Sequence, residues 1–427
     1  MEPKRRSSWM FVCLIAFVLL LLLVVFTVAA RSAPADSSGD LALVNGKVYP
    51  TPQAVPILDA VVLIHDGKIV AVGKDDEVQI PKSAYTIECA GRVIVAGFWN
   101  SHVHFTEDAW RDAGTAPAAR LEEHMQTRLT KWGDTTVFDI GSFPQDTLAL
   151  RRRVESGEIA GPKIYTTAGE IFPKDGIPVY LPMELASALK QQEAATPEDA
   201  TRLPRQSLAM GGDGIKLFTG AIVGHGKVTP MPVDIVRAAV EVAHAAGKPV
   251  FAHPSNHVGA NNALAGGVDI LAHTIPMEYD WTPDELQRMK EHHVALIPTL
   301  SLFPDEVRKD GGSEAAKTDI LKAAVAELKS YFRKGGTILF GTDVGYTQLY
   351  DTTSEYEYMG RAGMNFRDIL AALTTNPATF FKAEKSGKVV KSYAADLVVL
   401  DADPATDLRN FAKVDYTIRA GKIIYKK

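Results

Sequence analysis

Six side chains suited to holding a metal ion recur where apolar, strand-like segments of the sequence end. Two of them, His102 and His104, are two positions apart, and because strand side chains alternate between faces, both point the same way. The remaining four each lie within or at the end of a later apolar segment: Lys216, His253, His273 and Asp343. Imidazole and carboxylate groups bind zinc and other transition metals, so this set predicts a metal site.

No single member of this set is diagnostic. With 11 histidines in the chain, roughly 0.3 His-x-His pairs are expected by chance. Lys216 is more informative, because Ile215 and Leu217 should face surrounding helices and thus direct the lysine inward, where a lone ammonium is costly to bury. The convergence of all six residues on strand ends favours a metal site over a set of unrelated buried histidines.

The composition excludes several other kinds of protein. The 427 residues carry 46 Lys and Arg against 51 Asp and Glu, a net charge of −5, without a long basic run, so nucleic acid is not expected as a partner. The two cysteines are Cys13, in an apolar leader, and Cys89. The folded part should therefore hold neither an intramolecular disulfide nor a cysteine-rich zinc site, and any metal must have histidine and oxygen ligands.

Residues 1–30 have the pattern of a signal peptide or a transmembrane anchor. Lys4, Arg5 and Arg6 precede an uncharged run at 9–30, which as a helix of about 33 Å can span a bilayer. Small residues at its end suit signal peptidase, so cleavage and anchoring both stay open. We expect an extracytoplasmic protein, periplasmic or secreted, that is held at the membrane through 9–30 if the leader is not cleaved.

The middle of the chain alternates strand-like and helix-like segments. Helical patterns such as 233–246, which Gly247 ends, separate the strands. Eight such repeats within about 280 residues predict an α/β fold, a TIM (β/α)8 barrel, whose chemistry lies at the C-terminal ends of its strands. The stretch 170–212 is longer than one crossover needs and predicts a helical insertion over the barrel mouth. The expected strands are 93–98 continuing into 101–105, then 135–140, 163–167, 214–219, 249–253, 269–273, 295–300 and 337–343.

Both ends of the chain hold short β-like segments with tight-turn signals. Asn45-Gly46 and Asp66-Gly67 are dipeptides typical of hairpin turns, and Ala420-Gly421 separates two further strand-like segments. Because these ends flank one α/β middle, we expect them to form one small β-sandwich. The predicted domains are a leader at 1–30, a polar tether at 31–39, a composite sandwich of 40–95 and 385–427, and the barrel at 96–384.

These motifs resemble the amidohydrolase superfamily, in the imidazolonepropionase-like branch that also holds metal-dependent prolidases and other Xaa-amino-acid dipeptidases. The segment 93–104 is similar to the family's first-strand motif, and Lys216 within Gly-Ile-Lys-Leu-Phe is similar to its fourth-strand lysine. The resemblance covers nearly the whole chain after the leader. It includes the fifth, sixth and eighth βα units and the return to the sandwich, at 242–253, 266–273, 341–343, 376–378 and 394–400.

The resemblance implies two divalent ions per chain, with Zn²⁺ as the natural choice. A CO₂-derived carbamate on Lys216 would bridge them, since an ammonium cannot bind a cation whereas a carbamate offers two anionic oxygens. A hydroxide between the ions would attack an amide carbonyl, and Asp343 would move the proton to the leaving amine. One ion would be bound by His102, His104 and Asp343, and the second by His253 and His273, with Lys216 shared.

Two further residues are candidates for contact with substrate. His225, in Gly224-His225-Gly226-Lys227 after the fourth strand, is a candidate for binding substrate or stabilising the oxyanion, and therefore for catalysis. Tyr346, three residues after Asp343, is a candidate for binding substrate.

The expected function is hydrolysis of amide or peptide bonds in small molecules such as dipeptides or N-acyl amino acids. One alternative is a mononuclear deaminase or cyclic-amide hydrolase that leaves Lys216 unmodified and uses the other ligands except His273. Others are an ester or lactone hydrolase and a non-catalytic metal-binding protein. The exact substrate and the oligomeric state, including a homo-oligomer, are left open by the sequence.

Overall fold

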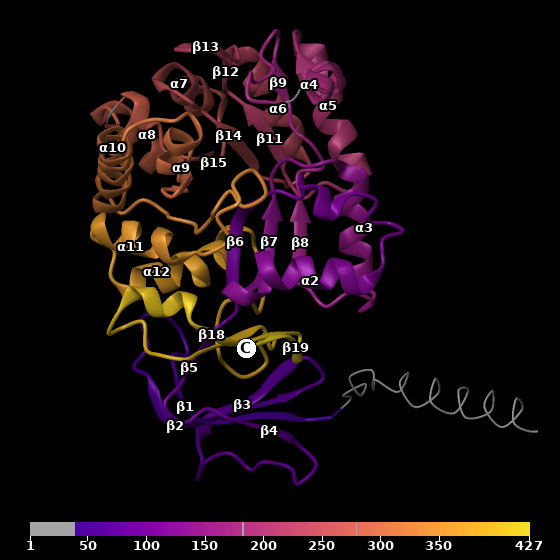
Figure 1. The fold of residues 1–427 in the computed structure, drawn as a ribbon, viewed down its shortest axis with the longest axis vertical. Coiled ribbons are helices and arrows are strands. Elements are labelled where there is room, and N and C mark those ends of the chain that lie inside the picture. Colours follow the sequence, from indigo (N-terminus) through magenta and orange to yellow (C-terminus); the bar gives the residue numbers. More distant parts are fainter. Residues whose placement is uncertain (1–38, 182, 279) are drawn as a thin grey trace, which may run out of the picture. The chain divides into compact units, whose positions relative to one another are not determined.

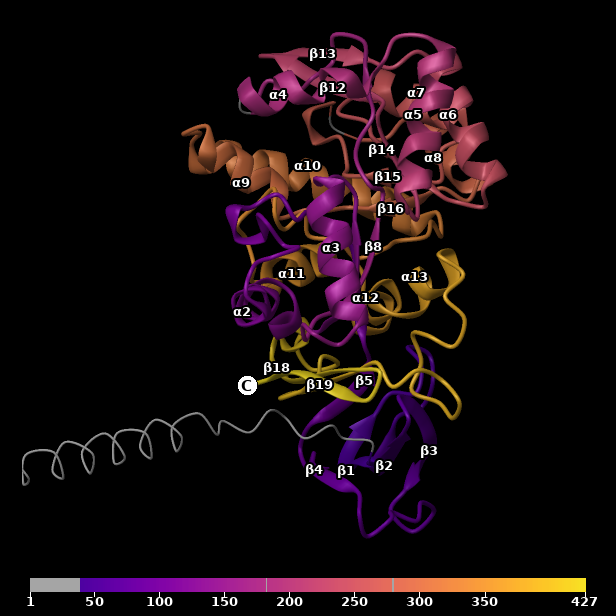
Figure 2. The ribbon, with the colours of Figure 1, turned by 90° about the vertical axis from the view of Figure 1, so that its right-hand side faces the viewer.

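The chain forms two parallel sheets that carry the candidate residues and a larger sheet built from both chain ends (Figures 1 and 2). The structure, a computed structural model, describes residues 39–181, 183–278 and 280–427. The predicted leader at 1–30 and the predicted tether, apart from Gly39, lie outside the described residues. Among the described helices, none combines the length and the apolar character that crossing a membrane requires.

Strands from the two chain ends pair in one eight-stranded sheet, in which β5 lies between β1 and β17. Figure 1 shows the indigo N-terminal strands beside the yellow C-terminal ones. Side chains from both ends, among them Leu43 and Val399, fill a single core cluster. Thus the two ends share one core, although their pairing runs through one continuous sheet. Its strands are β1 (Leu41–Val48), β2 (Ile57–His65), β3 (Lys68–Lys74), β4 (Tyr85–Glu88), β5 (Val93–Ala96), β17 (Leu397–Leu400), β18 (Val414–Arg419) and β19 (Lys422–Lys426).

The expected hairpin turn at Asn45-Gly46 is wrong. β1 continues through this dipeptide with a register shift against β2, and Asn45 takes a φ of +60°. A Cβ at Gly46 would lie 2.7 Å from Cδ1 of Ile94, so glycine lets β5 approach. The dipeptide is a bulge at which β1 changes its parallel partner from β4 to β5. Asp66-Gly67 and Ala420-Gly421 do form the tight turns that the sequence predicts.

Seven of the eight strands expected in the middle of the chain are present, in two parallel sheets. The eighth segment, 337–343, forms no regular strand: Ile338 makes an isolated parallel bridge to Leu296, and Asp343 leaves the β region with a φ of +60°. The next residue, Val344, makes an isolated parallel bridge to Val103. Another bridge, from Ile171 to Leu217, joins the segment that follows β8 to β11. The strands are β6 (Phe98–Val103), β7 (Asp134–Asp139) and β8 (Lys163–Thr166) in one sheet, and β11 (Ile215–Phe218), β14 (Val250–His253), β15 (Ile270–Ala272) and β16 (Ala295–Ile297) in the other.

Helices alternate with these strands, and side-chain caps fix where several begin. Thr282 and Glu285 form a reciprocal capping box at the start of α8, and Asn365 and Asp368 form another at α12. The helices are α2 (Ala118–Arg128), α3 (Pro144–Glu155), α4 (Met183–Leu189), α5 (Pro197–Met210), α6 (Val233–Ala245), α7 (His257–Gly266), α8 (Pro283–Glu291), α9 (Leu302–Lys309), α10 (Glu314–Arg333), α11 (Thr353–Arg361), α12 (Phe366–Leu373) and α13 (Thr375–Phe380).

The predicted insertion at 170–212 is only partly helical. Besides α4 and α5 it contains two short parallel strands, β9 (Phe172–Pro173) and β10 (Glu193–Ala194). A hairpin of β12 (Gly220–Gly224) and β13 (Lys227–Pro230) follows β11. These elements come after the C-terminal ends of β8 and β11, where the candidate residues lie.

The alternation of side chains along a strand determines which way Lys216 in β11 points. In β11, Ile215 and Leu217 belong to the large apolar core that includes helical residues such as Val236. Lys216 between them points the opposite way and is only 2% exposed. The sequence argument for an inward lysine is therefore matched by the burial pattern of the strand.

A buried carboxyl on α10 predicts a pH dependence of stability. Glu327 is fully buried, its Oε2 accepts a hydrogen bond from the Ile275 N–H at 2.6 Å, and burial raises its pKa to about 9. The unfolded chain releases this proton near pH 4.5, so the folded state binds more protons, and this group costs stability as pH rises from about 4.5 to about 9. We expect Glu327→Gln to remove that dependence.

The measurement is the melting temperature of wild type and Glu327→Gln at about pH 6 and about pH 9. The wild type should lose several degrees relative to the variant at the higher pH. An identical pH dependence in the two proteins would contradict the assignment of a neutral buried carboxyl.

Candidate metal centre

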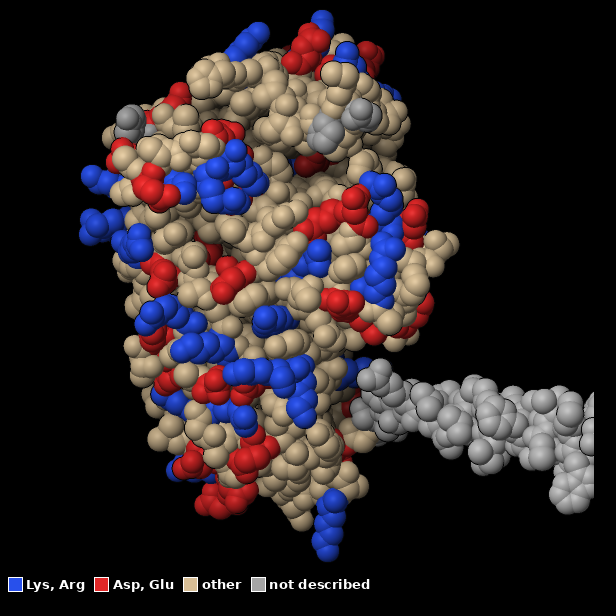
Figure 3. Space-filling model, in the orientation of Figure 1, with Lys and Arg blue, Asp and Glu red and all other residues tan. Residues whose placement is uncertain are grey.

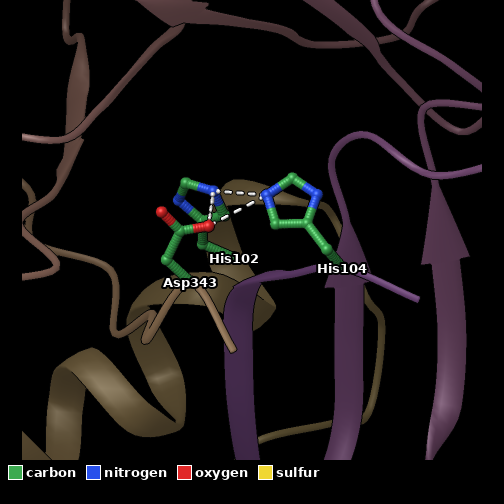
Figure 4. A group of neighbouring side chains, drawn as sticks. All are labelled: His102, His104 and Asp343. Carbon is green, nitrogen blue, oxygen red and sulfur yellow. Dashed lines mark hydrogen bonds and ion pairs between the residues drawn. The ribbon is translucent and has the colours of Figure 1, made fainter. Parts of the chain in front are cut away.

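Three of the predicted ligands meet at the C-terminal end of β6 (Figure 4). Oδ1 of Asp343 lies 3.0 Å from Nε2 of His102 and 2.9 Å from Nε2 of His104. The two Nε2 atoms are 3.2 Å apart. Asp343 is 241 positions after His102 and 239 after His104 in the sequence, yet the three donor atoms converge on one point.

The backbone fixes the tautomer of His104. Its Nδ1 lies 2.6 Å from the carbonyl oxygen of Gly141, which can only accept, so Nδ1 carries the proton and donates it. In the neutral ring, Nε2 then presents a lone pair toward Asp343. Gly141 is in turn held by Asp139, whose Oδ1 accepts hydrogen bonds from the Gly141 N–H and the Ser142 hydroxyl.

His273 approaches the same carboxylate from β15. Its Nε2 lies 3.8 Å from Oδ2 of Asp343, and its Nδ1 lies 2.6 Å from the hydroxyl of Thr299. His273, Thr299 and Asp343 all have positive φ, at +86°, +44° and +60°. Left-handed backbone at three non-glycine residues is strained, and such strain gathers at functional sites.

His253 and Lys216 complete the neighbourhood on the side of β11 and β14. The ring of His253 lies 4.9 Å from that of His273 and stacks on Phe218 at 4.6 Å, measured between ring centroids. Nζ of Lys216 lies 5.6 Å from the Phe218 centroid. The structure therefore brings all six predicted ligands to one region, although only His102, His104 and Asp343 form a tight group among the described residues.

Burial dominates the protonation of four of the six predicted ligands. It lowers the pKa of Lys216 to about 8, that of His102 to about 4 and that of His253 to about 3. It also holds the pKa of His273 well below its usual range. These histidines are therefore neutral near pH 7, which is the form that binds a metal ion.

Asp343 and His104 behave as an ion pair would. Burial acts to raise the pKa of Asp343, but the charge of His102 and the hydrogen bonds from both histidines outweigh it and hold that pKa well below its usual range. For His104, burial acts to lower the pKa, and the hydrogen bond and charge of Asp343 outweigh it and raise the pKa. A carboxylate therefore faces the two imidazoles.

The donor set fits a divalent cation. Nε2 of His102, Nε2 of His104 and Oδ1 of Asp343 all lie within 3.2 Å of one another, and the Asp343 side chain is only 4% exposed. Two imidazole nitrogens and a carboxylate oxygen are ordinary ligands for zinc and related metals. A cation between them would relieve the crowding of lone pairs that such convergence creates.

The other two predicted residues lie away from this group. His225 is exposed in the turn between β12 and β13, and no described contact joins it to the six ligands, so its catalytic and substrate-binding roles stay predictions. Tyr346 lies nearer, because its N–H donates to the Asp343 carbonyl and its hydroxyl donates to Glu306. The ring of Tyr180, from the inserted segment, lies 5.4 Å from that of Tyr346.

Sequence reasoning missed three residues that support the site. Thr299 and Gly141 each hold an imidazole, and Glu170 approaches the site from the segment after β8. None is part of a motif. Their contacts depend on strand register and on backbone turns, which leave no signal in a single sequence.

A model of the amidohydrolase family matches residues 93–424, which is most of the chain. The chain belongs to the amidohydrolase family. It is therefore a hydrolase of carbon–nitrogen bonds of the amide or peptide type, in a family that generally uses divalent metal ions. The resemblance predicted from the motifs is confirmed.

Individual relatives of this amidohydrolase have low sequence identity to it, but the similarity extends over most of both chains. Ochratoxinase of Aspergillus niger is 23% identical over 418 residues, covering 86% of this chain and 83% of the relative. Dihydroorotase of Ligilactobacillus salivarius is 24% identical over 404 residues, covering 84% and 88%. The solved structure of a Xaa-Pro dipeptidase with methionine in its active site matches with a TM-score of 0.78 at 22% identity, covering 91% of this chain and all of that one. That structure shows a shared fold.

The hydroxyl of Thr299 gives a test of how the site holds a metal. Thr299→Val keeps the shape of the side chain and removes the partner of His273 Nδ1, so we expect metal affinity to fall about 10- to 100-fold. The measurement is a chelator competition that follows bound metal. Thr274→Val is the matched control, since the Thr274 hydroxyl is buried without a partner among the described residues. Equal affinity in both variants would contradict a positioning role for Thr299.

Proposed function

We propose that this amidohydrolase cleaves amide or peptide bonds in dipeptides or N-acyl amino acids at a binuclear metal centre. The observation that carries the proposal is the convergence of the Asp343 carboxylate with His102 and His104, beside the buried Lys216 and the half-buried His253. We propose further that the two parallel sheets and their bridges form the (β/α)8 barrel. The residues that would hold the ions are His102, His104, Lys216, His253, His273 and Asp343, and zinc suits them.

Lys216 supports the binuclear form. Its pKa of about 8 leaves a fraction of neutral amine near pH 7. That nitrogen can attack the carbon of CO₂ and release one proton, which gives a carbamate with two anionic oxygens. Among the described residues, no carboxylate pairs with Nζ at ion-pair distance, so the modification breaks no existing salt bridge.

Asp343 is the residue suited to moving the proton. Its carboxylate is ionised, and its Oδ2 is the atom left free of the two close imidazoles. The bound ions would polarise the scissile carbonyl and make water a stronger acid. Asp343 would accept the proton that this water loses and deliver it to the nitrogen of the departing amine.

The surroundings of the site suit a small peptide-like substrate. Tyr346, with Tyr180 against it, would form an aromatic wall beside Asp343. Several exposed apolar side chains lie on the segments that follow β8, β11, β14 and β15, where they would contact apolar side chains of a substrate. They are Val179, Met183, Ile222, Val258 and Met277.

A mononuclear deaminase or cyclic-amide hydrolase is the second candidate. It is favoured by the single tight group of His102, His104 and Asp343 among the described residues. His253 would be its fourth ligand, and Lys216 would keep its amine. This form predicts hydrolysis of cyclic amides or release of ammonia from aminated heterocycles.

The extracytoplasmic location remains part of the proposal. It rests on the three basic residues that precede the uncharged run at 9–30. Residues 9–30 would also provide contact with the membrane if the leader is retained.

Asp343→Asn tests the catalytic proposal. The amide keeps the shape of the side chain but cannot accept a proton, so turnover of a responsive dipeptide should fall at least about 100-fold. The panel contains dipeptides, N-acyl amino acids and cyclic amides, and circular dichroism checks the fold. Near-normal turnover by the folded variant would contradict the role of Asp343, and wild-type activity on cyclic amides alone would favour the mononuclear candidate.

A further inference from the structure

Glu170 reaches the site by strand register. Ile171 bridges Leu217 in parallel, with hydrogen bonds from the Ile171 N–H to the Lys216 carbonyl and from the Phe218 N–H to the Ile171 carbonyl. Ile171 and Leu217 belong to the same apolar core. The preceding residues, Glu170 and Lys216, therefore turn to the opposite face, toward the metal ligands.

The backbone before Glu170 is built to turn it inward. Ala168 and Gly169 have φ of +52° and +122°, and the Ala168 N–H donates to the Thr166 hydroxyl. The Thr166 hydroxyl in turn donates to Asp139, the residue that holds Gly141. The turn that presents Glu170 is thus tied to the same carboxylate that fixes the partner of His104.

Gly141 makes room for the carboxylate. A Cβ at residue 141 would lie 1.9 Å from Oε1 of Glu170, so only glycine admits this close packing. Despite the tight fit, no hydrogen bond or ion pair engages the Glu170 carboxylate among residues 39–181, 183–278 and 280–427. As a whole residue Glu170 is half-buried.

The Glu170 carboxylate has both positively and negatively charged neighbours, and none of them forms an ion pair with it among the described residues. Burial raises the pKa of Glu170 and the carboxylates of Asp139 and Asp343 add to the rise, while the positive charges of His104 and Lys216 oppose it without cancelling it. Burial keeps His102, His253 and His273 neutral. On the face shown in Figure 3, acidic and basic side chains intermingle, so selection of a charged group falls to individual residues at the site.

We propose that Glu170 binds the α-ammonium group of the substrate's N-terminal residue, which makes the enzyme a dipeptidase rather than a hydrolase of N-acyl amino acids. The inference rests on the proposed amide hydrolysis and names its substrate class. Conversion of Lys216 to a carbamate would remove one of the cations that face Glu170, and the substrate ammonium would take its place beside Glu170. Glu170 is here a specificity residue that touches substrate without taking part in bond cleavage.

The test compares two substrates that differ in one group. Leucyl-alanine carries the ammonium, and 4-methylpentanoyl-alanine has hydrogen in its place. The full chain loaded with zinc should prefer leucyl-alanine by roughly 10- to 100-fold in kcat/KM. Glu170→Gln should lose that preference through a higher KM for leucyl-alanine, while 4-methylpentanoyl-alanine stays within about twofold. Glu193→Gln is the control, because Glu193 lies in the same segment and accepts from the Asp175 N–H.

The metal content of the Glu170→Gln variant shows whether Glu170 binds the substrate or the metal ions. Unchanged metal together with the substrate-specific loss supports the proposal. Loss of metal, an equal loss on both substrates, no loss at all, or a wild-type preference for 4-methylpentanoyl-alanine overturns it while leaving amide hydrolysis intact. A wild-type enzyme that cleaves neither substrate nor any other linear amide overturns the proposed function, and this inference with it.

Discussion

A buried carboxylate facing two imidazoles is the interaction on which the site depends. Oδ1 of Asp343 lies about equally close to the Nε2 atoms of His102 and His104, at 3.0 and 2.9 Å, with almost no solvent access. Burying a charge and several lone pairs is costly unless a partner compensates. Left-handed backbone at Asp343 and His273 adds strain to this cost, and a cation bound by the converging donors would compensate for the buried charge. The buried charge and the strained backbone therefore lower the stability of the folded chain at the place where the metal ligands converge.

Strand ends from two separate parallel sheets supply the converging residues. The ring of His273 lies 4.7 Å from that of His102 and 4.9 Å from that of His253, so residues remote in sequence become neighbours. Carboxylates farther out hold the loops. Glu355, whose pKa burial raises to about 7, accepts from the N–H groups of Leu300 and Ser301 and so fixes the loop that carries Thr299. His104 and His273 are thus each oriented through a second group, as metal ligands generally are.

The sequence was most informative where the chemistry is local. His102-Val103-His104 and the inward Lys216 follow from strand alternation alone, and seven expected strands are present. The prediction of a turn at Asn45-Gly46 was wrong because β1 pairs there with β5, which lies almost 50 residues later in the sequence. That pairing makes the dipeptide a bulge, and the local sequence does not reveal it. The segment 337–343 failed as a regular strand because Asp343 needs a positive φ to face the imidazoles. Thr299, Gly141 and Glu170 were missed because they act through register and backbone carbonyls, which only the folded chain displays.

Metal content per chain tests the central claim most directly. The full chain, prepared with zinc and bicarbonate and freed of excess metal, should retain about two zinc ions, as two ligand groups joined by a modified lysine require. Mass spectrometry under native conditions should show the added mass of CO₂ on the same protein. One ion with an unmodified lysine would contradict the binuclear centre, and a folded protein without metal would contradict the account of the site as a whole.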